Sequence, residues 1–274
     1  MPLARRSWLF VPGADVAAHR AAARSGADVI VLELEDFTPP ELRAKARALS
    51  APAFALWRKS GAIAAVRINP LEADGIDDLA GIERPDVLMM SKVATPEQVQ
   101  RLEAAAPPGA ELVPNIESAA GLLRTAEIAR ASKRISALLV ASEDMVADLG
   151  TERSRDGVEL AYVRARFLVE CRAAGVEAID CPYTFSDVKG AIADACYAKR
   201  LGYRMKSLVD PSHAKAINAV LTPSPRELAH ARKVVAAFER ARAAGRERAK
   251  VDGALIEVPI YAAAKRLLAS TARS

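Results

Sequence analysis

Short runs of apolar and β-branched residues recur along the chain, and each is followed by a stretch rich in Ala, Arg and Glu with helical spacing. This alternation is typical of parallel βα units, in which each buried strand leads into a covering helix. It predicts eight strands, the number that closes a (β/α)8 barrel, at residues 7–11, 29–33, 64–68, 86–90, 111–113, 137–140, 177–180 and 204–208.

A doubly wound open sheet is the other architecture that such alternation allows. It predicts a GxGxxG turn after the first strand, and the segment at residues 11–15, VPGAD, lacks that glycine spacing. We therefore expect an α/β fold of the TIM-barrel class.

A long helix is predicted after the eighth unit, where Ser224-Pro225-Arg226-Glu227 combines an N-cap, a proline at the first helical position and a capping-box glutamate. Residues 251–259 have an extended or hairpin-like pattern, and helical spacing resumes at residue 260. We expect two domains: a barrel over residues 1–221, and a C-terminal helical extension with a flap over residues 222–274.

The chain has 274 residues and a net charge of +5, from 39 Lys and Arg against 34 Asp and Glu. The excess lies within residues 226–250, which hold eight basic and three acidic residues. A basic run confined to one helix is typical of a solvated face, with an anionic ligand or partner as the less frequent case. No nucleic-acid groove is predicted.

Cysteine usage and hydropathy indicate the compartment. Three cysteines without CxxC spacing predict neither a disulfide framework nor a zinc site. The apolar run that starts at Trp8 is broken by Pro12 and Gly13, and no run of about 18 apolar residues follows. We expect a cytoplasmic protein with no membrane contact.

Polar residues that are unusual in buried strands stand at the C-terminal ends of the predicted strands, which form the catalytic rim of a TIM barrel. They are Glu33, Glu35, Asp36, Arg67, Asn69, Lys92, Asn115, Glu117, Glu143, Asp144 and Asp180. Converging carboxylates repel one another without a counter-ion, and Mg²⁺ is commonly held by one or two carboxylates with water and substrate oxygens. The sequence therefore predicts a magnesium site at this rim.

Several of these candidates also have a structural interpretation. Glu117 and Asp144 can be first-turn acids that a helix dipole favours. Lys92 can pair with a nearby acid, whereas Arg67 ends an apolar strand and needs an anionic partner, which favours a functional role. A Schiff-base lysine, Lys92 or Lys206, is a minor alternative, and the three histidines suggest no catalytic arrangement.

Short motifs follow one another along nearly the whole chain. They lie at residues 6–13 (RSWLFVPG), 34–36 (LED), 66–69 (VRIN), 116–121 (IESAAG), 143–144 (ED), 147–150 (ADLG), 178–180 (AID) and 221–224 (LTPS). In this order they resemble the citrate lyase β-subunit-like group of HpcH/HpaI aldolases. No single motif is specific, but the ordered set is.

The resemblance implies a TIM barrel that holds Mg²⁺ through Glu117 and Asp144, and an Arg67 that binds the carboxylate and carbonyl oxygens of a 2-oxo acid. It also implies a CoA thioester partner, whose phosphates are met by basic residues such as Arg43 and Arg47. The implied enzyme is a Mg²⁺-dependent carbon–carbon lyase. It cleaves or forms a β-hydroxyacyl-CoA such as malyl-, citramalyl- or citryl-CoA, and cleavage gives an acyl-CoA and a 2-oxo acid.

The chain departs from the family's pattern around the expected site. Glu33 stands where relatives commonly have Asp, and Asp210 stands where they have His. The acid expected from the C-terminal flap is Glu257. By resemblance, Glu257 acts as the general acid/base in a neighbouring subunit of a homo-oligomer, a trimer or hexamer, with Asp36 and Asp180 as the next candidates.

Two other functions stay open at the level of sequence. A metal-dependent aldolase for free 2-oxo-4-hydroxy acids would need neither CoA nor the two helix arginines. A catalytically reduced barrel that serves as a binding or assembly subunit is suggested by the altered C-terminal acid.

Overall fold

The computed structural model describes residues 5–272 and divides into two compact units. Residues Arg5–Leu221 form the first unit, and the chain from Thr222 onward belongs to the second. The first four and the last two residues, which the expected domain boundaries include, lie outside the described residues.

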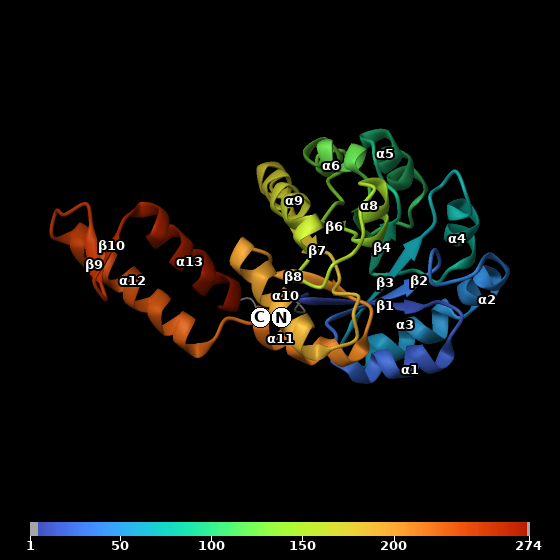
Figure 1. Ribbon diagram of the computed structural model, residues 1–274, viewed down its shortest axis with the longest axis horizontal. Coiled ribbons are helices and arrows are strands. Elements are labelled where there is room, and N and C mark those ends of the chain that lie inside the picture. The colour runs from blue at the N-terminus through green and yellow to red at the C-terminus, as the bar shows by residue number, and fades with distance from the viewer. Residues whose placement is uncertain (1–4, 273–274) are drawn as a thin grey trace. The chain divides into compact units, whose positions relative to one another are not determined.

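Eight parallel strands of the first unit close into a barrel in sequence order, and the first strand pairs with the last (Figure 1). The prediction of a TIM barrel is confirmed. β5 runs through Pro114 to Ile116, beyond its predicted end, although proline donates no ladder hydrogen bond. The strands are β1 (Ser7–Pro12), β2 (Val29–Glu33), β3 (Ile63–Ile68), β4 (Val87–Met90), β5 (Glu111–Ile116), β6 (Ala137–Val140), β7 (Glu177–Asp180) and β8 (Met205–Leu208).

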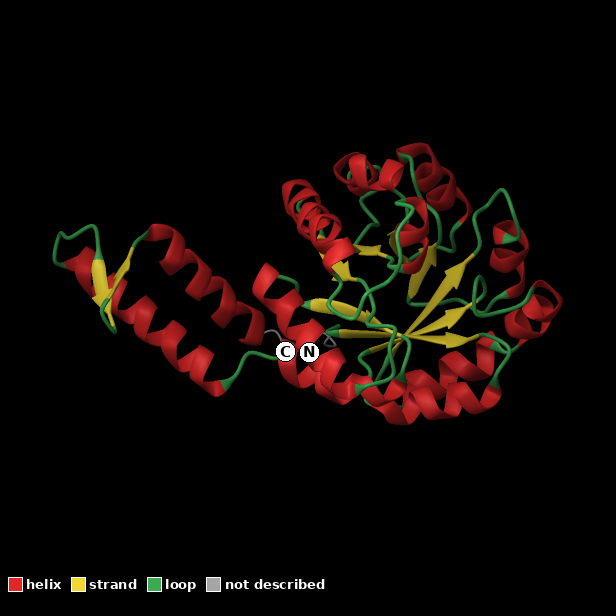
Figure 2. Cartoon of the chain, in the orientation of Figure 1, coloured by secondary structure: helices red, strands yellow, loops and turns green. Residues whose placement is uncertain are grey.

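Helices surround this barrel (Figure 2). The sequence sets their starts locally: at α5, the Thr95 hydroxyl accepts from the Gln98 amide N–H, and the Gln98 side chain accepts from the Thr95 amide. The helices are α1 (Val16–Ser25), α2 (Arg43–Ala48), α3 (Ser50–Lys59), α4 (Gly75–Gly81), α5 (Pro96–Ala105), α6 (Ala119–Leu123), α7 (Thr125–Ala129), α8 (Glu143–Asp148), α9 (Ala161–Ala174), α10 (Val188–Leu201) and α11 (Ala214–Leu221), with short 3₁₀ helices η1 (Pro40–Leu42), η2 (Val158–Leu160) and η3 (Pro211–His213).

Alternate residues of each strand face opposite sides of the barrel wall. Trp8 and Phe10 of β1 belong to the cluster that fills the barrel interior, whereas Leu9 packs in the layer between strands and helices. Ile179 and Met205 also face inward. Their neighbours Asp180 and Lys206 must therefore point outward, toward the helices.

These outward residues form a buried cluster of four charges between the barrel wall and the helices. Asp180 Oδ2 accepts hydrogen bonds from Arg164 Nη2 at 2.6 Å and from Lys206 Nζ at 2.7 Å. Asp194 pairs with the same two cations, at 2.7 and 2.5 Å. Burial by itself lowers the pKa of Lys206, but Asp180 and Asp194 outweigh it and raise the pKa, so the amine stays charged.

Two sequence-based expectations are therefore wrong. Asp180 does not point into the mouth of the barrel, so it is not a candidate base. Lys206 is not the nucleophile of a Schiff base, because its ammonium group is fully buried and held by two carboxylates. Asp180 was expected at the rim from its place at a strand end, and Lys206 was a minor alternative as a Schiff-base lysine. The two-residue period of the strands directs both side chains away from the barrel interior.

The second unit consists of two helices and a two-stranded antiparallel sheet. α12 (Pro225–Ala243) begins at the predicted capping box, β9 (Ala249–Val251) pairs with β10 (Ala254–Ile256), and α13 (Val258–Ala272) follows. The rings of Phe238 and Tyr261 stack at 4.6 Å between the helices. Within residues 5–272, no helix combines the length and the apolar composition needed to span a membrane.

The buried cluster predicts a strong dependence of stability on Asp180. Asp180→Asn removes the charge between Arg164 and Lys206, and breaking a buried ion pair costs about 3–5 kcal/mol. Glu177→Gln on the same strand is the matched control, because its pair with Arg172 at 3.4 Å is half exposed and worth less than about 1 kcal/mol. Urea unfolding followed by circular dichroism measures both, and equal small losses would contradict the assignment.

Candidate active site

Arg67 lies at the centre of the polar residues at the rim. It stands in β3, and its side chain is only 7% exposed. Four carboxylates surround its guanidinium, with nitrogen–oxygen distances of 2.9 Å to Glu33, 3.1 Å to Glu35, 3.6 Å to Asp36 and 3.6 Å to Glu117. Burial by itself lowers the pKa of Arg67, but the charges of Glu33, Glu117 and Glu35 raise it, so the residue is a permanent cation.

Glu33 holds both Arg67 and the loop that follows β2. Its Oε1 accepts from the Glu35 amide at 2.7 Å and from Arg67 Nε at 2.9 Å, and its Oε2 accepts from the Phe37 amide at 2.6 Å. The side chain is fully buried. The longer acid at this position therefore has a structural reason: it positions the arginine and closes the loop.

The guanidinium of Arg67 lines a cavity at the rim and has donors to spare. Nε donates to Glu33, and the guanidinium lies 5.3 Å from the centre of the Phe10 ring. Nη1 and Nη2 take part in ion pairs but donate no hydrogen bond within the described chain. These planar N–H groups can therefore bind a carboxylate.

Glu117 and Asp144 come from neighbouring strands of the barrel. Glu117 follows β5, and Asp144 lies in the first turn of α8, after β6. Glu117 is 3% exposed, and neither of its carboxylate oxygens has a hydrogen-bond partner within the described chain. Burial raises the pKa of the Glu117 carboxyl to about 8; Arg67 lowers it in part, while Glu35 and Asp144 raise it.

This geometry fits a hard divalent cation. A buried carboxylate without hydrogen-bond donors is costly unless a positive charge compensates it. No cluster of three or more Asp, Glu, His or Cys side chains with metal-site geometry occurs among the described residues. A cation at Glu117 and Asp144 would thus take its other ligands from water and substrate, as Mg²⁺ commonly does.

Lys92 connects the loop after β2 with α8. Its ammonium group contacts Glu35 and lies 3.7 Å from Asp36 and 3.8 Å from Asp144. Burial by itself lowers the pKa of Lys92, but these carboxylates raise it, so it is a poor Schiff-base nucleophile. Its backbone has a φ of 56°, in the left-handed region, where a non-glycine residue carries strain that is often found at functional sites.

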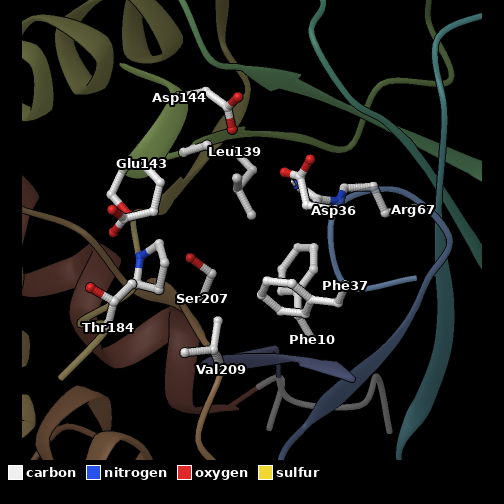
Figure 3. A pocket seen from close by; sticks show the side chains of 13 residues that line it. Phe10, Asp36, Phe37, Arg67, Leu139, Glu143, Asp144, Thr184, Ser207 and Val209 are labelled. Carbon is white, nitrogen blue, oxygen red and sulfur yellow. Dashed lines mark hydrogen bonds and ion pairs between the residues drawn. The ribbon is translucent and has the colours of Figure 1, made fainter. Parts of the chain in front are cut away.

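A cavity of about 350 Å³ opens beside Arg67 at the C-terminal rim (Figure 3). Asp36, which is half exposed, reaches it from the loop after β2, so the structure brings Asp36, Arg67 and Asp144 together. Most of the apolar and hydroxyl residues that line the cavity were not predicted from the sequence. Ser207 and Val209 could have been, because they follow the buried Met205 at intervals of two residues and so face the same side of the strand. The lining is formed by Phe10, Asp36, Phe37, Arg67, Leu139, Ala141, Ser142, Glu143, Asp144, Pro182, Thr184, Ser207 and Val209.

The arginines expected to meet CoA phosphates are already paired with acids. Arg43 contacts Asp74, and Arg47 Nη1 lies 3.0 Å from Oδ1 of Asp78. Asp78 is fully buried and also accepts from the side chain and amide of Asn69. Arg47 therefore helps to fix α2 against α4, and Asn69 is part of that structural contact rather than of the cavity lining.

Glu257 lies in the second compact unit, between β10 and α13. Its carboxylate pairs with Arg248 at 3.2 Å, and about half of its side chain is exposed. Its expected role in trans remains a prediction.

The fold and the rim together define a TIM-barrel protein in which a buried arginine and several carboxylates meet at the C-terminal ends of the strands. A sequence model of the HpcH/HpaI aldolase/citrate lyase family matches residues 6–211. The chain belongs to this family.

Named relatives span almost the whole chain. The citrate lyase subunit beta of Escherichia coli K12 is 33% identical over 96% of this chain and 92% of its own length. A (3S)-malyl-CoA thioesterase of Cereibacter sphaeroides is 30% identical over 96% and 93%. The crystal structure of CitE from Mycobacterium tuberculosis, in complex with magnesium, acetoacetate and coenzyme A, superposes with a TM-score of 0.77 at 26% identity, covering 98% of each chain.

The raised pKa of Glu117 predicts that the stability of the protein depends on pH and on Mg²⁺. Without Mg²⁺, its carboxyl stays protonated in the folded protein up to a pH of about 8 but ionises from its ordinary pKa of 4.5 in the unfolded chain. The free energy of unfolding should therefore fall as the pH rises between these values, and Glu117→Gln should flatten that fall.

Mg²⁺ at 100 times its Kd should stabilise the wild type by about 2.7 kcal/mol and leave Glu117→Gln unchanged. Melting temperatures with EDTA or Mg²⁺ measure this. Equal stabilisation of both proteins by Mg²⁺ would show that Glu117 is not a ligand.

Proposed function

We propose that this protein is a Mg²⁺-dependent carbon–carbon lyase that cleaves, or in reverse forms, a β-hydroxyacyl-CoA thioester. The observation that carries the proposal is the contact, at one barrel mouth, between Arg67 and Glu117, a buried carboxylate with two unsatisfied oxygens. The family membership and the relative named citrate lyase subunit beta support it, and the relative named (3S)-malyl-CoA thioesterase supports a CoA thioester as the substrate.

Each rim residue has a role in this proposal. The Nη groups of Arg67 bind the carboxylate of the 2-oxo acid half and compensate negative charge that develops as the carbon–carbon bond breaks. Glu117 and Asp144 hold Mg²⁺, which supplies Lewis-acid polarisation of substrate oxygens when bound. Glu33 keeps Arg67 in place.

Cleavage needs one proton to be removed and one to be delivered. A base takes the proton of the β-hydroxyl while the bond between the α and β carbons breaks, so the β carbon becomes the carbonyl of the 2-oxo acid. The α carbon takes up a proton and gives the acyl-CoA. Asp36, at the cavity, and Glu257, from the flap of a neighbouring subunit in a homo-oligomer, are the proposed acid/base groups.

One observation favours a second function. Arg43 and Arg47, which were expected at the CoA phosphates, are engaged by Asp74 and Asp78. An aldolase for free 2-oxo-4-hydroxy acids would need no phosphate-binding cations, so it is the alternative to the thioester lyase.

A thioester panel tests both functions. Malyl-, citramalyl- and citryl-CoA, and free 2-oxo-4-hydroxy acids, are supplied with Mg²⁺ or with EDTA, and products are separated by liquid chromatography with mass detection. The lyase releases an acyl-CoA and a 2-oxo acid without free thiol, whereas thioester hydrolysis releases free CoA. Turnover of free acids alone, or turnover unaffected by EDTA, would reject the proposal.

Arg67→Lys is expected to lose activity although it keeps the charge. Lysine lacks the planar pair of donors that matches a carboxylate, and a hydrogen bond to a charged group contributes about 1.5–3 kcal/mol, or about 10- to 150-fold in kcat/KM. The steady-state kinetics of the variant measure this, with its circular dichroism spectrum as the control for folding. If this variant bound the 2-oxo acid with the affinity of the wild type, Arg67 would not be a binding residue.

The proposed role of Glu257 in a neighbouring subunit predicts that two weakly active variants restore activity when their subunits are mixed. Glu257→Gln and Arg67→Lys should each be weakly active alone, because each lacks one part of the proposed site. After subunit exchange, mixed oligomers should recover part of the activity through sites that combine two intact parts. Exchange shown by mass spectrometry without any recovery would assign the acid/base role to Asp36.

A further inference from the structure

The lining of the cavity beside Arg67 is asymmetric in charge. Arg67 is the one cation among the lining residues, all of which the structure describes, and it already faces four carboxylates. The other charged residues of the lining are the acids Asp36, Glu143 and Asp144. Figure 3 shows Asp144 and Glu143 on one side of the cavity and Asp36 beside Arg67.

Two cations that contact acids of this lining, Lys92 and Arg153, are themselves paired. Lys92 contacts Glu35 and lies within 4 Å of Asp36 and Asp144. Arg153 lies 3.2 Å from Glu143 and also pairs with Glu159. Neither residue lines the cavity.

The remaining wall is apolar or carries hydroxyl groups. Leu139, Ala141, Pro182 and Val209 provide the apolar part. Two of the three hydroxyl groups are already donors: Ser207 Oγ donates to the Asp180 carbonyl at 2.8 Å, and Ser142 Oγ donates to Glu143 at 3.3 Å. Among the hydroxyl groups of the lining, only that of Thr184 has no hydrogen-bond partner within the described residues.

The composition of this wall favours a 2-oxo acid with an alkyl substituent over one with a second carboxylate. Arg67 and a Mg²⁺ at Glu117 and Asp144 would both be engaged by the carboxylate and carbonyl oxygens that every 2-oxo acid has, and the lining holds no further cation. A second carboxylate would therefore lose its hydration against apolar groups and nearby acids. A short alkyl group would instead bury apolar surface, which contributes roughly a factor of four in affinity per methylene. The cavity, about 350 Å³, is at the small end of ligand pockets.

We infer that the 2-oxo acid handled at this site is a monocarboxylate with a short alkyl substituent, and that a 2-oxo dicarboxylate is a much poorer substrate. The inference rests on the proposed lyase function and narrows it to one substrate class. The selectivity arises from Leu139, Ala141, Pro182 and Val209, which leave no cation for a second carboxylate.

The test uses the condensation direction, with acetyl-CoA and one 2-oxo acid at a time. Pyruvate, 2-oxobutyrate, oxaloacetate and 4-methyl-2-oxopentanoate form the panel. The last has the size of oxaloacetate but carries an uncharged isopropyl group in place of the second carboxylate, and it is called the neutral match for that reason. Products are identified by mass, so pyruvate formed from oxaloacetate by spontaneous decarboxylation is not mistaken for oxaloacetate turnover. We expect kcat/KM for pyruvate and 2-oxobutyrate to exceed that for oxaloacetate at least tenfold, and the neutral match to exceed oxaloacetate as well.

A pair of variants at Val209 tests the wall itself. Val209→Lys supplies the missing cation, and Val209→Met is the neutral control of similar length. The lysine variant should raise the ratio of oxaloacetate to pyruvate turnover about tenfold, and the methionine variant should not.

The failures of the inference and of the proposed function are distinguishable. Product formation that prefers oxaloacetate over both pyruvate and the neutral match would overturn the inference and leave the lyase function standing. Absence of product with every 2-oxo acid, in a protein that is folded and supplied with Mg²⁺, would overturn the lyase function itself.

Discussion

The burial of the Arg67 guanidinium is the constraint on which the rim depends. A cation with this little exposure requires compensating acids, and the carboxyl ends of neighbouring parallel strands deliver them to one place. Glu33, Glu35, Asp36, Glu117 and Asp144 are five acids against two cations, Arg67 and Lys92, so the rim would carry an excess of three negative charges with every acid ionised. That excess makes the site suitable for a divalent cation.

A second buried cluster of charged side chains differs from the rim, because its cations and acids are equal in number and all of them are paired. Arg164, Lys206, Asp180 and Asp194 are two cations and two acids, and hydrogen bonds or short ion pairs connect them. At the rim, by contrast, both oxygens of Glu117 lack donors. A cluster whose polar atoms are all paired stabilises the fold, whereas buried oxygens without donors, such as those of Glu117, leave room for a further partner.

In the proposed lyase, different residues around Arg67 would serve the reaction and the choice of substrate. The arginine and the two carboxylates are suited to any 2-oxo acid, because each possesses the same carboxylate and carbonyl oxygens. In the proposed lyase, the substituent of that acid would meet the wall formed by residues from β6 and from the ends of β7 and β8. A change at Val209 is therefore expected to alter the choice of substrate without altering the bond that is broken.

The sequence by itself determined the eight strands, their order, the capping boxes, and the placement of Arg67, Glu117 and Asp144 at strand ends. These features depend on local periodicity and on the rule that parallel strands present their carboxyl ends together. Only the tertiary structure decided the partners of each side chain. Asp180 points outward, Arg47 joins Asp78 across 31 residues, and Glu33 holds Arg67 across 34. Such contacts depend on the register between strands and on helix packing, which no local pattern encodes.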